Sequence, residues 1–161
     1  LLDFIRDRLT LKERASEFMR LHRKWKPQHA AYEKYGLQAD IEYIKILQQQ
    51  KAHSFEIVEL GGKLGKADRI NRLIPVAADG KFWMPEAIMR TTHEHKVEEQ
   101  ILMLIEQEFL AWPVPVHDDG MDVIARMFDV PDFEFPEPVE EPHADDRYHR
   151  KRQAPGTWMS R

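Results

Sequence analysis

A proline-broken loop followed at once by an acidic helix start is the feature that most restricts how this chain can fold. The prolines of Trp112-Pro113-Val114-Pro115 lack a backbone N–H and bias the residue before them toward extended geometry, so no helix continues through them. Apolar residues then recur at helical spacing, which predicts a helix that begins near Asp118. These residues are Met121, Ile124, Ala125 and Phe128.

Two interpretations of the acidic helix start remain open. Asp118 and Asp119 are adjacent, and Asp122 follows one turn later. The simpler interpretation is an acidic first turn that caps the helix and complements its dipole, and the motif taken alone favours it. The second is a divalent-metal site, because clustered carboxylates repel one another unless a cation or a proton lies between them.

Charge is distributed unevenly along the 161 residues. Residues 1–72 hold 15 Lys and Arg against 10 Asp and Glu, whereas residues 73–161 hold 9 against 18. This excludes a protein that coats DNA with a uniformly basic surface, but it allows a local basic face beside an acidic metal-binding end. From Asp129 onward, prolines alternate with acidic residues before a basic cluster, so we expect a domain over residues 1–128 and a flexible tail over residues 129–161.

The chain contains no cysteine, which removes disulfides and thiolate zinc sites. No apolar run approaches the ~18 residues of a membrane span, and the first residues lack the layout of a signal peptide. We therefore expect an intracellular, cytoplasmic protein without membrane partners.

Helical and strand patterns alternate, which predicts an α/β fold. Thr10 and Glu13 form a capping box that begins a helix, and Lys26-Pro27 ends it. The remaining expected elements are strands at residues 1–5, 28–32, 54–60 and 81–84, a helix at residues 37–50, a helix with an apolar face from Ala67 to Ile74 that Pro75 ends, and a long helix from Thr91-Thr92 to Phe109.

Glu33 follows the strand expected at residues 28–32. In open α/β sheets the functional crevice lies outside the carboxyl ends of the strands, so Glu33 is a candidate catalytic acid. The alternative is a solvated carboxylate beside Lys34, and this residue alone does not decide between them.

A basic segment follows the strand expected at residues 54–60. It resembles a phosphate-binding loop only superficially, because Leu60 stands where that loop needs glycine and Ala67 where it needs Ser or Thr. The segment suits a DNA phosphate backbone or exposure to water, and its candidate DNA-binding residues are Lys63, Lys66, Arg69 and Arg72.

Four stretches together resemble the C-terminal nuclease domain of tailed-phage large terminases, the DNA-packaging motor subunit. They cover most of residues 1–128 and keep the family's order and spacing. They are residues 2–9 leading into Trp25-Lys26-Pro27, the strand that ends on Glu33, residues 66–85 with their Lys66–Ile70 and Gly80–Pro85 segments, and residues 108–122 with Trp112-Pro113 and the His-Asp-Asp motif.

The resemblance implies a ribonuclease H-like mixed sheet flanked by helices. It also implies two Mg²⁺ or Mn²⁺ ions that hydrolyse phosphodiester bonds of concatemeric DNA, with Glu33, Asp118 and Asp119 as catalytic, metal-binding residues and His117 and Asp122 close behind them. Such ions, about 3.5–4 Å apart, activate water and stabilise the leaving oxygen. The implied partners are double-stranded DNA, a portal protein, the small terminase subunit and further copies in the motor, all in the cytoplasm of a host cell.

The family's first-strand aspartate has no match in this chain. In the family's fold two further strands lie between that aspartate and the first helix, whereas only residues 6–9 separate Asp3 from the helix that begins at Thr10. We therefore expect the first strands, one metal ligand and the ATPase half to lie upstream of Leu1, and the chain alone to have weak or no nuclease activity. Two alternatives stay open. One is a non-catalytic module that binds DNA or a motor partner through residues 63–72 and the tail, and the other is a resolvase- or transposase-type nuclease.

Overall fold

The computed structural model describes residues 1–34 and 38–135, and it has a mixed α/β fold. Helix α1 (Leu11–Trp25) begins as the sequence predicts. The Thr10 hydroxyl accepts from the backbone N–H of Glu13, and the Glu13 carboxylate accepts from the N–H of Thr10. Lys26 ends α1 in a left-handed conformation, immediately before Pro27.

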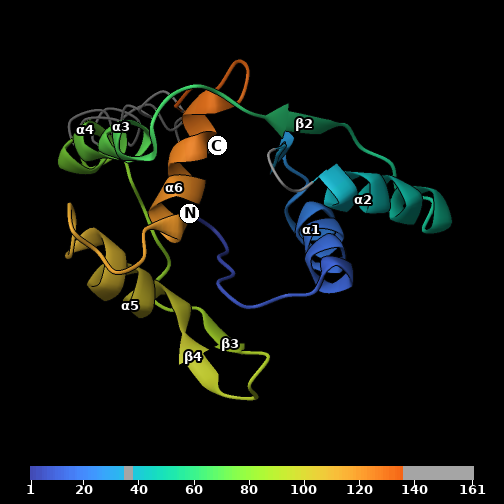
Figure 1. Cartoon of the computed structure of the whole chain (residues 1–161), viewed down its shortest axis with the longest axis horizontal. Coiled ribbons are helices and arrows are strands. Elements are labelled where there is room, and N and C mark those ends of the chain that lie inside the picture. The colour runs from blue at the N-terminus through green and yellow to red at the C-terminus, as the bar shows by residue number, and fades with distance from the viewer. Residues whose placement is uncertain (35–37, 136–161) are drawn as a thin grey trace, which may run out of the picture.

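Strand β1 (Ala30–Glu33) pairs in parallel with β2 (Ile57–Leu60), with Ala30 opposite Ile57 and Glu33 opposite Leu60. Helix α2 (Gln38–Gln50) lies between the two strands in the chain and packs against α1 (Figure 1). The α1–α2 contact buries apolar side chains at helical spacing, which are Ala15, Met19, Ile44 and Leu47. The predicted strand ending at Glu33 is confirmed.

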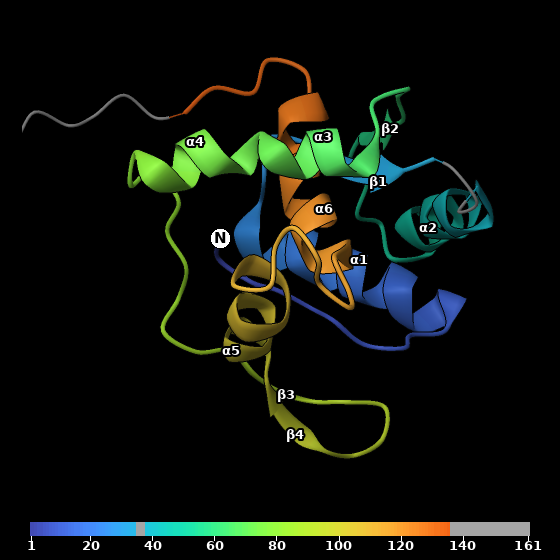
Figure 2. The ribbon, with the colours of Figure 1, turned by 60° about the vertical axis from the view of Figure 1, so that its left-hand side comes forward.

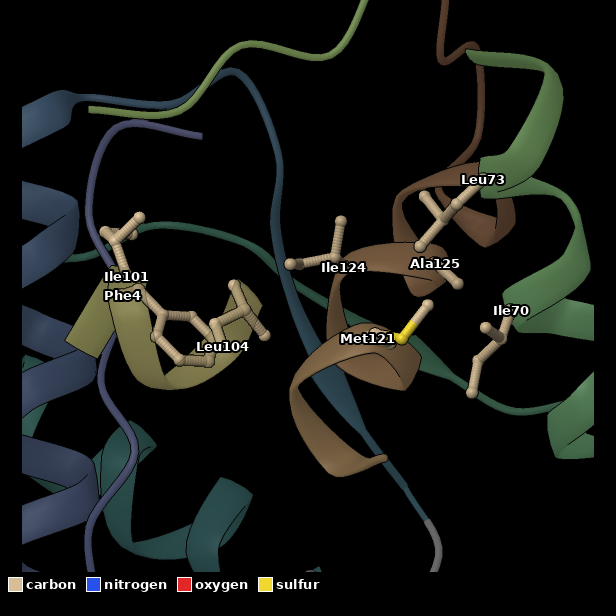
Figure 3. Close-up of a cluster of buried hydrophobic side chains, with 8 residues drawn as sticks. All are labelled: Phe4, Ile70, Leu73, Ile101, Leu104, Met121, Ile124 and Ala125. Atoms are coloured by element: carbon tan, nitrogen blue, oxygen red, sulfur yellow. The ribbon is translucent and has the colours of Figure 1, made fainter. Parts of the chain in front are cut away.

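Helices α3 (Lys66–Asn71) and α4 (Leu73–Ala78) follow each other nearly end to end and lie across α6 (Asp119–Ala125) in Figure 2. The predicted helix end at Pro75 is wrong, because Pro75 lies in the first turn of α4, where its missing N–H is not needed. The prediction of a helix that begins near Asp118 is confirmed. Helix α6 lies between two groups of apolar side chains, with Ile70 and Leu73 on one side and Phe4, Ile101 and Leu104 on the other (Figure 3). A short 3₁₀ helix, η2 (Arg126–Asp129), continues α6.

The prediction of one long helix over residues 91–109 is wrong at its start. Strands β3 (Met89–Thr91) and β4 (Val97–Glu99) form an antiparallel hairpin, and the helix begins only at α5 (Gln100–Leu104). The Glu99 carboxylate accepts from the N–H groups of Ile101 and Leu102, which caps α5, and it also accepts from Ile88 across the hairpin. A π-helical segment, η1 (Ile105–Phe109), completes this helix.

The strands predicted at residues 1–5 and 81–84 are also absent from the described part of the chain. Both segments are irregular, and the Trp83 side chain is 78% exposed. The two segments are joined by a hydrogen bond in which the Leu1 amino group donates to the Trp83 carbonyl at 2.7 Å. Phe4 is nevertheless buried against α5 and α6.

The sheets are small. Within residues 1–34 and 38–135, the strands form only the parallel β1–β2 pair and the antiparallel β3–β4 pair. In that part of the chain, no helix is both long and apolar enough to cross a bilayer. Asp129 and the aromatic residues after it pack on the fold, with Phe133 and Phe135 against Phe128, while residues 136–161 of the predicted tail lie outside the described residues.

Candidate functional site

Helices α3 and α6 face each other through apolar side chains on one side and through ion pairs on the other. Ile70 and Leu73 meet Met121 and Ala125 in the core (Figure 3). The charged contacts involve three cations at every third position of residues 66–72, each of which holds an acid on or next to α6. These contacts, which we call the ion ladder, are Lys66 with Asp118 and Asp119, Arg69 with Asp122, and Arg72 with Asp129.

The first contact of the ion ladder places two carboxylates around one cation. The Lys66 Nζ lies 2.6 Å from Oδ1 of Asp118 and 2.6 Å from Oδ1 of Asp119. The hydrogen bond from Lys66 lowers the pKa of Asp119, and the charges of Lys66, His117 and Arg6 lower it further. Partial burial alone would lower the pKa of Lys66, but its hydrogen bonds to both carboxylates raise it.

Asp118 does not cap α6 with its side chain. It occupies the N-cap position, but its carboxylate makes no capping hydrogen bond and points to Lys66 instead. Only its backbone carbonyl accepts from the N–H of Asp122, at 3.0 Å. The carboxylates of Asp118 and Asp119 therefore complement the helix dipole, but their oxygens contact the Lys66 ammonium. This weakens the interpretation that Asp118 caps the helix with its side chain.

Asp122 makes the most buried contact of the ion ladder. Arg69 donates from Nε to Oδ1 and from Nη2 to Oδ2, both at 2.8 Å, and the two side chains are 10% and 14% exposed. The hydrogen bonds to Asp122 raise the pKa of Arg69, and the charges of Glu33 and Asp129 add to this effect.

Glu33 contacts the opposite end of α6 from Asp118 and Asp119. The Arg126 Nη2 donates to Glu33 Oε1 at 2.5 Å, and the Arg126 Nη1 donates to Asp129 at 3.1 Å. Arg126 is seven residues beyond Asp119, which corresponds to about 10 Å along a helix. The fold thus brings Glu33 to the C-terminal end of α6, and not to its start, which carries the His-Asp-Asp motif and where the resemblance implies that Glu33 should lie.

The predicted DNA-binding residues differ in whether they form ion pairs within the protein. Lys66, Arg69 and Arg72 are all engaged in the ion ladder, and Arg69 is buried. Arg72 also lies over the Phe128 ring, 5.1 Å from its centroid. Lys63 and His117 are exposed, and within the described ranges neither forms an ion pair, so Lys63 remains open to a phosphate.

The donor chemistry at Asp118 and Asp119 fits one divalent ion. Their oxygens are hard ligands that already converge on a single cation, and the Asp119 side chain is 82% exposed, so a hydrated ion can reach it. In residues 1–34 and 38–135, however, no three or more Asp, Glu or His side chains are grouped as metal ligands. Glu33 is bound to Arg126, so a second ion held with Glu33 requires a rearrangement of the Arg126 side chain.

Two charged residues near the start of α6, Glu108 and Arg6, were not predicted as site residues from the sequence. Glu108 is fully buried in η1, and Arg6 lies beside it. The signal for Glu108 was present, because Ile101, Leu104 and Glu108 share one helical face, and a carboxylate on an apolar face indicates a buried charge. Arg6 gave no such signal, since 102 positions separate it from Glu108.

A comparison of the chain with protein-family models, with curated proteins and with solved structures found no match.

Proposed function

We propose that this chain belongs to a metal-dependent DNA endonuclease of the packaging-terminase class. In this proposal, β1, α2 and β2 form part of a ribonuclease H-like fold. Asp118 and Asp119 bind Mg²⁺ or Mn²⁺, and Glu33 contributes to the same reaction from the end of β1. The substrate is the phosphodiester backbone of double-stranded DNA, and the partners are the other subunits of a packaging motor.

The observation that carries the proposal is the convergence of Asp118 and Asp119 on one cation. Adjacent carboxylates in a first helical turn normally point away from each other or cap the helix. Here both Oδ1 atoms lie 2.6 Å from the Lys66 ammonium. Lys66 occupies the position that a divalent ion would take, and carboxylate oxygens prefer Mg²⁺ or Mn²⁺.

When bound, a divalent ion supplies an activated water and charge stabilisation for the leaving oxygen. The residues of the chain would hold the ion and orient the DNA. Asp118 and Asp119 would provide oxygens at the start of α6, and the exposed Lys63, three residues before Lys66, would contact a phosphate. Glu33 must leave Arg126 to take part, so the proposal includes a movement of the Arg126 side chain when metal and DNA bind.

The test is a plasmid-nicking assay with Mg²⁺ or Mn²⁺, performed on the product of the complete reading frame. Asp119→Ala is expected to reduce nicking by at least about a hundredfold, because it removes a ligand of the ion. Asp79→Ala is the matched control, since Asp79 is an exposed aspartate that also pairs with a lysine, Lys81, at 3.3 Å. Nicking that survives Asp119→Ala unchanged refutes the proposal.

The alternative is a non-catalytic module that binds DNA or a motor partner. It is favoured by the fact that Glu33, Asp118, Asp119 and Asp122 all hold basic side chains, as purely structural carboxylates do. Under this alternative, Lys63→Glu abolishes DNA binding in a salt-dependent assay, and Asp119→Ala leaves binding intact. Lys63 is the appropriate residue to reverse, because charge reversal at Arg69 would also break the buried pair with Asp122.

A further inference from the structure

The C-terminal ends of α1 and α2 lie at the same end of this helix pair. Near the helix starts, Arg14 of α1 binds Asp40 of α2 at 2.6 Å. Near the helix ends, the Nδ1 of His22 lies 3.0 Å from the Nε2 of His53, which follows α2. The two helices therefore run in the same direction. Lys51 belongs to the same end, because two residues of chain, from Lys51 to His53, span at most about 7 Å.

Three exposed cations lie at this end of the pair, and together we call them the cationic end. They are Arg23, Lys26 and Lys51. Within residues 1–34 and 38–135, none of the three forms an ion pair. Asp3 approaches this end, but the Lys24 ammonium holds its carboxylate at 2.9 Å. The three positive charges are therefore available to an anion from outside the protein.

An exposed indole lies beside these charges. Trp25 is 40% exposed, its Nε1 donates to the Asp3 carboxylate at 3.4 Å, and the Lys24 ammonium lies 4.5 Å from its ring centroid. The two contacts fix the orientation of the ring while part of it faces solvent. Proteins that bind single-stranded nucleic acids combine these elements, because cations contact the phosphates and aromatic rings stack on unpaired bases.

Lys26 occupies a backbone position that suits glycine better. It ends α1 with a φ of 46° and a ψ of 55°, in the left-handed region, where an L side chain is disfavoured and glycine is the usual residue. Cations near a helix C-terminus complement the helix dipole, which accounts for positive charge at this end in general. The dipole does not account for a lysine at this position or for an exposed tryptophan beside it.

We propose that the cationic end binds single-stranded DNA, with phosphates on its three cations and one base stacked on Trp25. Duplex DNA offers phosphates but no unpaired base, and an acidic protein segment offers carboxylates without a regular row of rings. The cations and the indole together therefore favour a single strand. The contacts need no divalent ion, so this inference goes beyond the proposed nuclease function and does not depend on it.

The test is fluorescence anisotropy of a labelled oligothymidylate of about 15 nucleotides, titrated with the complete chain in EDTA. Lys26→Gly is expected to weaken binding about fivefold, because one phosphate contact is lost. It is also expected to raise the melting temperature, because glycine suits the left-handed backbone. Lys12→Gln is the matched control and should change the affinity by less than about twofold. Lys12 is an exposed lysine in the first turn of α1, at the opposite end of the helix.

Two further variants separate the charges from the ring. The triple variant Arg23→Gln, Lys26→Gly, Lys51→Gln is expected to reduce the slope of log affinity against log salt concentration by about 2, since each phosphate contact on a single strand contributes about 0.7. Trp25→Leu is expected to weaken binding roughly tenfold and to leave the salt slope unchanged, because stacking releases no counterions.

Three outcomes would overturn the inference. The first is a triple variant that binds the oligothymidylate as the wild type does. The second is a duplex of the same length that binds equally well while Trp25→Leu has no effect, which would assign the surface to phosphates alone. The third is polyglutamate that competes as effectively as unlabelled oligothymidylate, which would assign the surface to an acidic protein.

Circular dichroism establishes that each variant is folded. If Trp25→Leu does not fold, Lys26→Gly decides the question, and wild-type affinity in that variant overturns the inference. Because no metal is present in the titration, a failure of the plasmid-nicking assay leaves these results unchanged.

Discussion

Arg69 donates two parallel N–H···O hydrogen bonds of 2.8 Å to the carboxylate of Asp122. The third nitrogen of its guanidinium group, Nη1, donates to the Leu64 carbonyl at 2.6 Å. One guanidinium group thus joins α6 to α3 and to the loop before α3. Planar, bidentate contacts of this kind are the strongest ion pairs in proteins. Because both side chains are nearly buried, removing one partner leaves an uncompensated charge in the interior.

The first prediction concerns this pair. Asp122→Ala is expected to lower the free energy of unfolding by about 3 kcal/mol, because it strands the Arg69 charge. Asp79→Ala, which removes an exposed partner of Lys81, should change it by less than about 0.5 kcal/mol. Urea denaturation of both variants makes the comparison, and equal losses would show that Asp122 is not a structural anchor.

The second prediction tests the close approach at position 120. Gly120→Ala is expected to cost about 1–3 kcal/mol of stability, because the new methyl group overlaps Leu104 and Glu108. Gly62→Ala is the control, since a Cβ atom there meets nothing within 4 Å. Thermal unfolding distinguishes the two. A Gly120→Ala variant as stable as the control would contradict the packing of Glu108 against α6.

The third prediction concerns pH. His22 Nδ1 lies 3.0 Å from His53 Nε2, and the His22 ring stacks on Phe55 at 3.6 Å. Burial and the charge of His53 lower the pKa of His22 below 6.5. The unfolded chain therefore takes up a proton that the folded chain resists, so stability falls as the pH drops below 6.5.

The measurement for His22 is the free energy of unfolding in urea between pH 8 and pH 5. His22→Gln is expected to lose stability at pH 8, because the ring stack is gone, but to show a flatter dependence on pH. A variant that declines as steeply as the wild type would assign the acid sensitivity to other groups.

The fourth prediction concerns Tyr32, whose hydroxyl donates to Asp40 at 2.8 Å. Burial, followed by the bond to Asp40, raises the pKa of Tyr32 to about 12. Its contribution to stability is complete below pH 10 and is lost as the pH rises toward 12. Phenolate absorbance in a pH titration, with Tyr32→Phe as the reference, should show one tyrosine ionising near pH 12. Asp40→Asn should lower this pKa.

Local chemistry made part of the fold predictable from the sequence. The capping box at Thr10 and Glu13, the strand that ends at Glu33 and the helix that begins near Asp118 all depend on residues close together in the chain, and the structure contains them. The prolines at 113 and 115 likewise separate η1 from α6, as their chemistry requires.

Long-range contacts account for what the sequence could not predict. The periodicity after Thr92 is helical, yet Glu99 bonds to Ile88 across the hairpin, and this contact delays the helix until Gln100. The partner of Glu33 is Arg126, 93 positions away, so no local pattern could reveal which end of α6 it would meet. Candidate acids were identifiable by type and position, but their cations were not.

The parallel direction of β1 and β2 has a consequence for how the molecule tolerates length changes. Both strands end on the same edge, and residues 61–65 alone carry the chain from Leu60 to the first turn of α3. The length of this five-residue connection determines where Lys66, Arg69 and Arg72 lie along α6, and so which acid each of them contacts. A single-residue insertion that joined the first turn of α3, instead of lengthening the loop, would turn the residues after it by about 100° around the helix axis. Every cation would then face a different neighbour, even though no charged residue had changed.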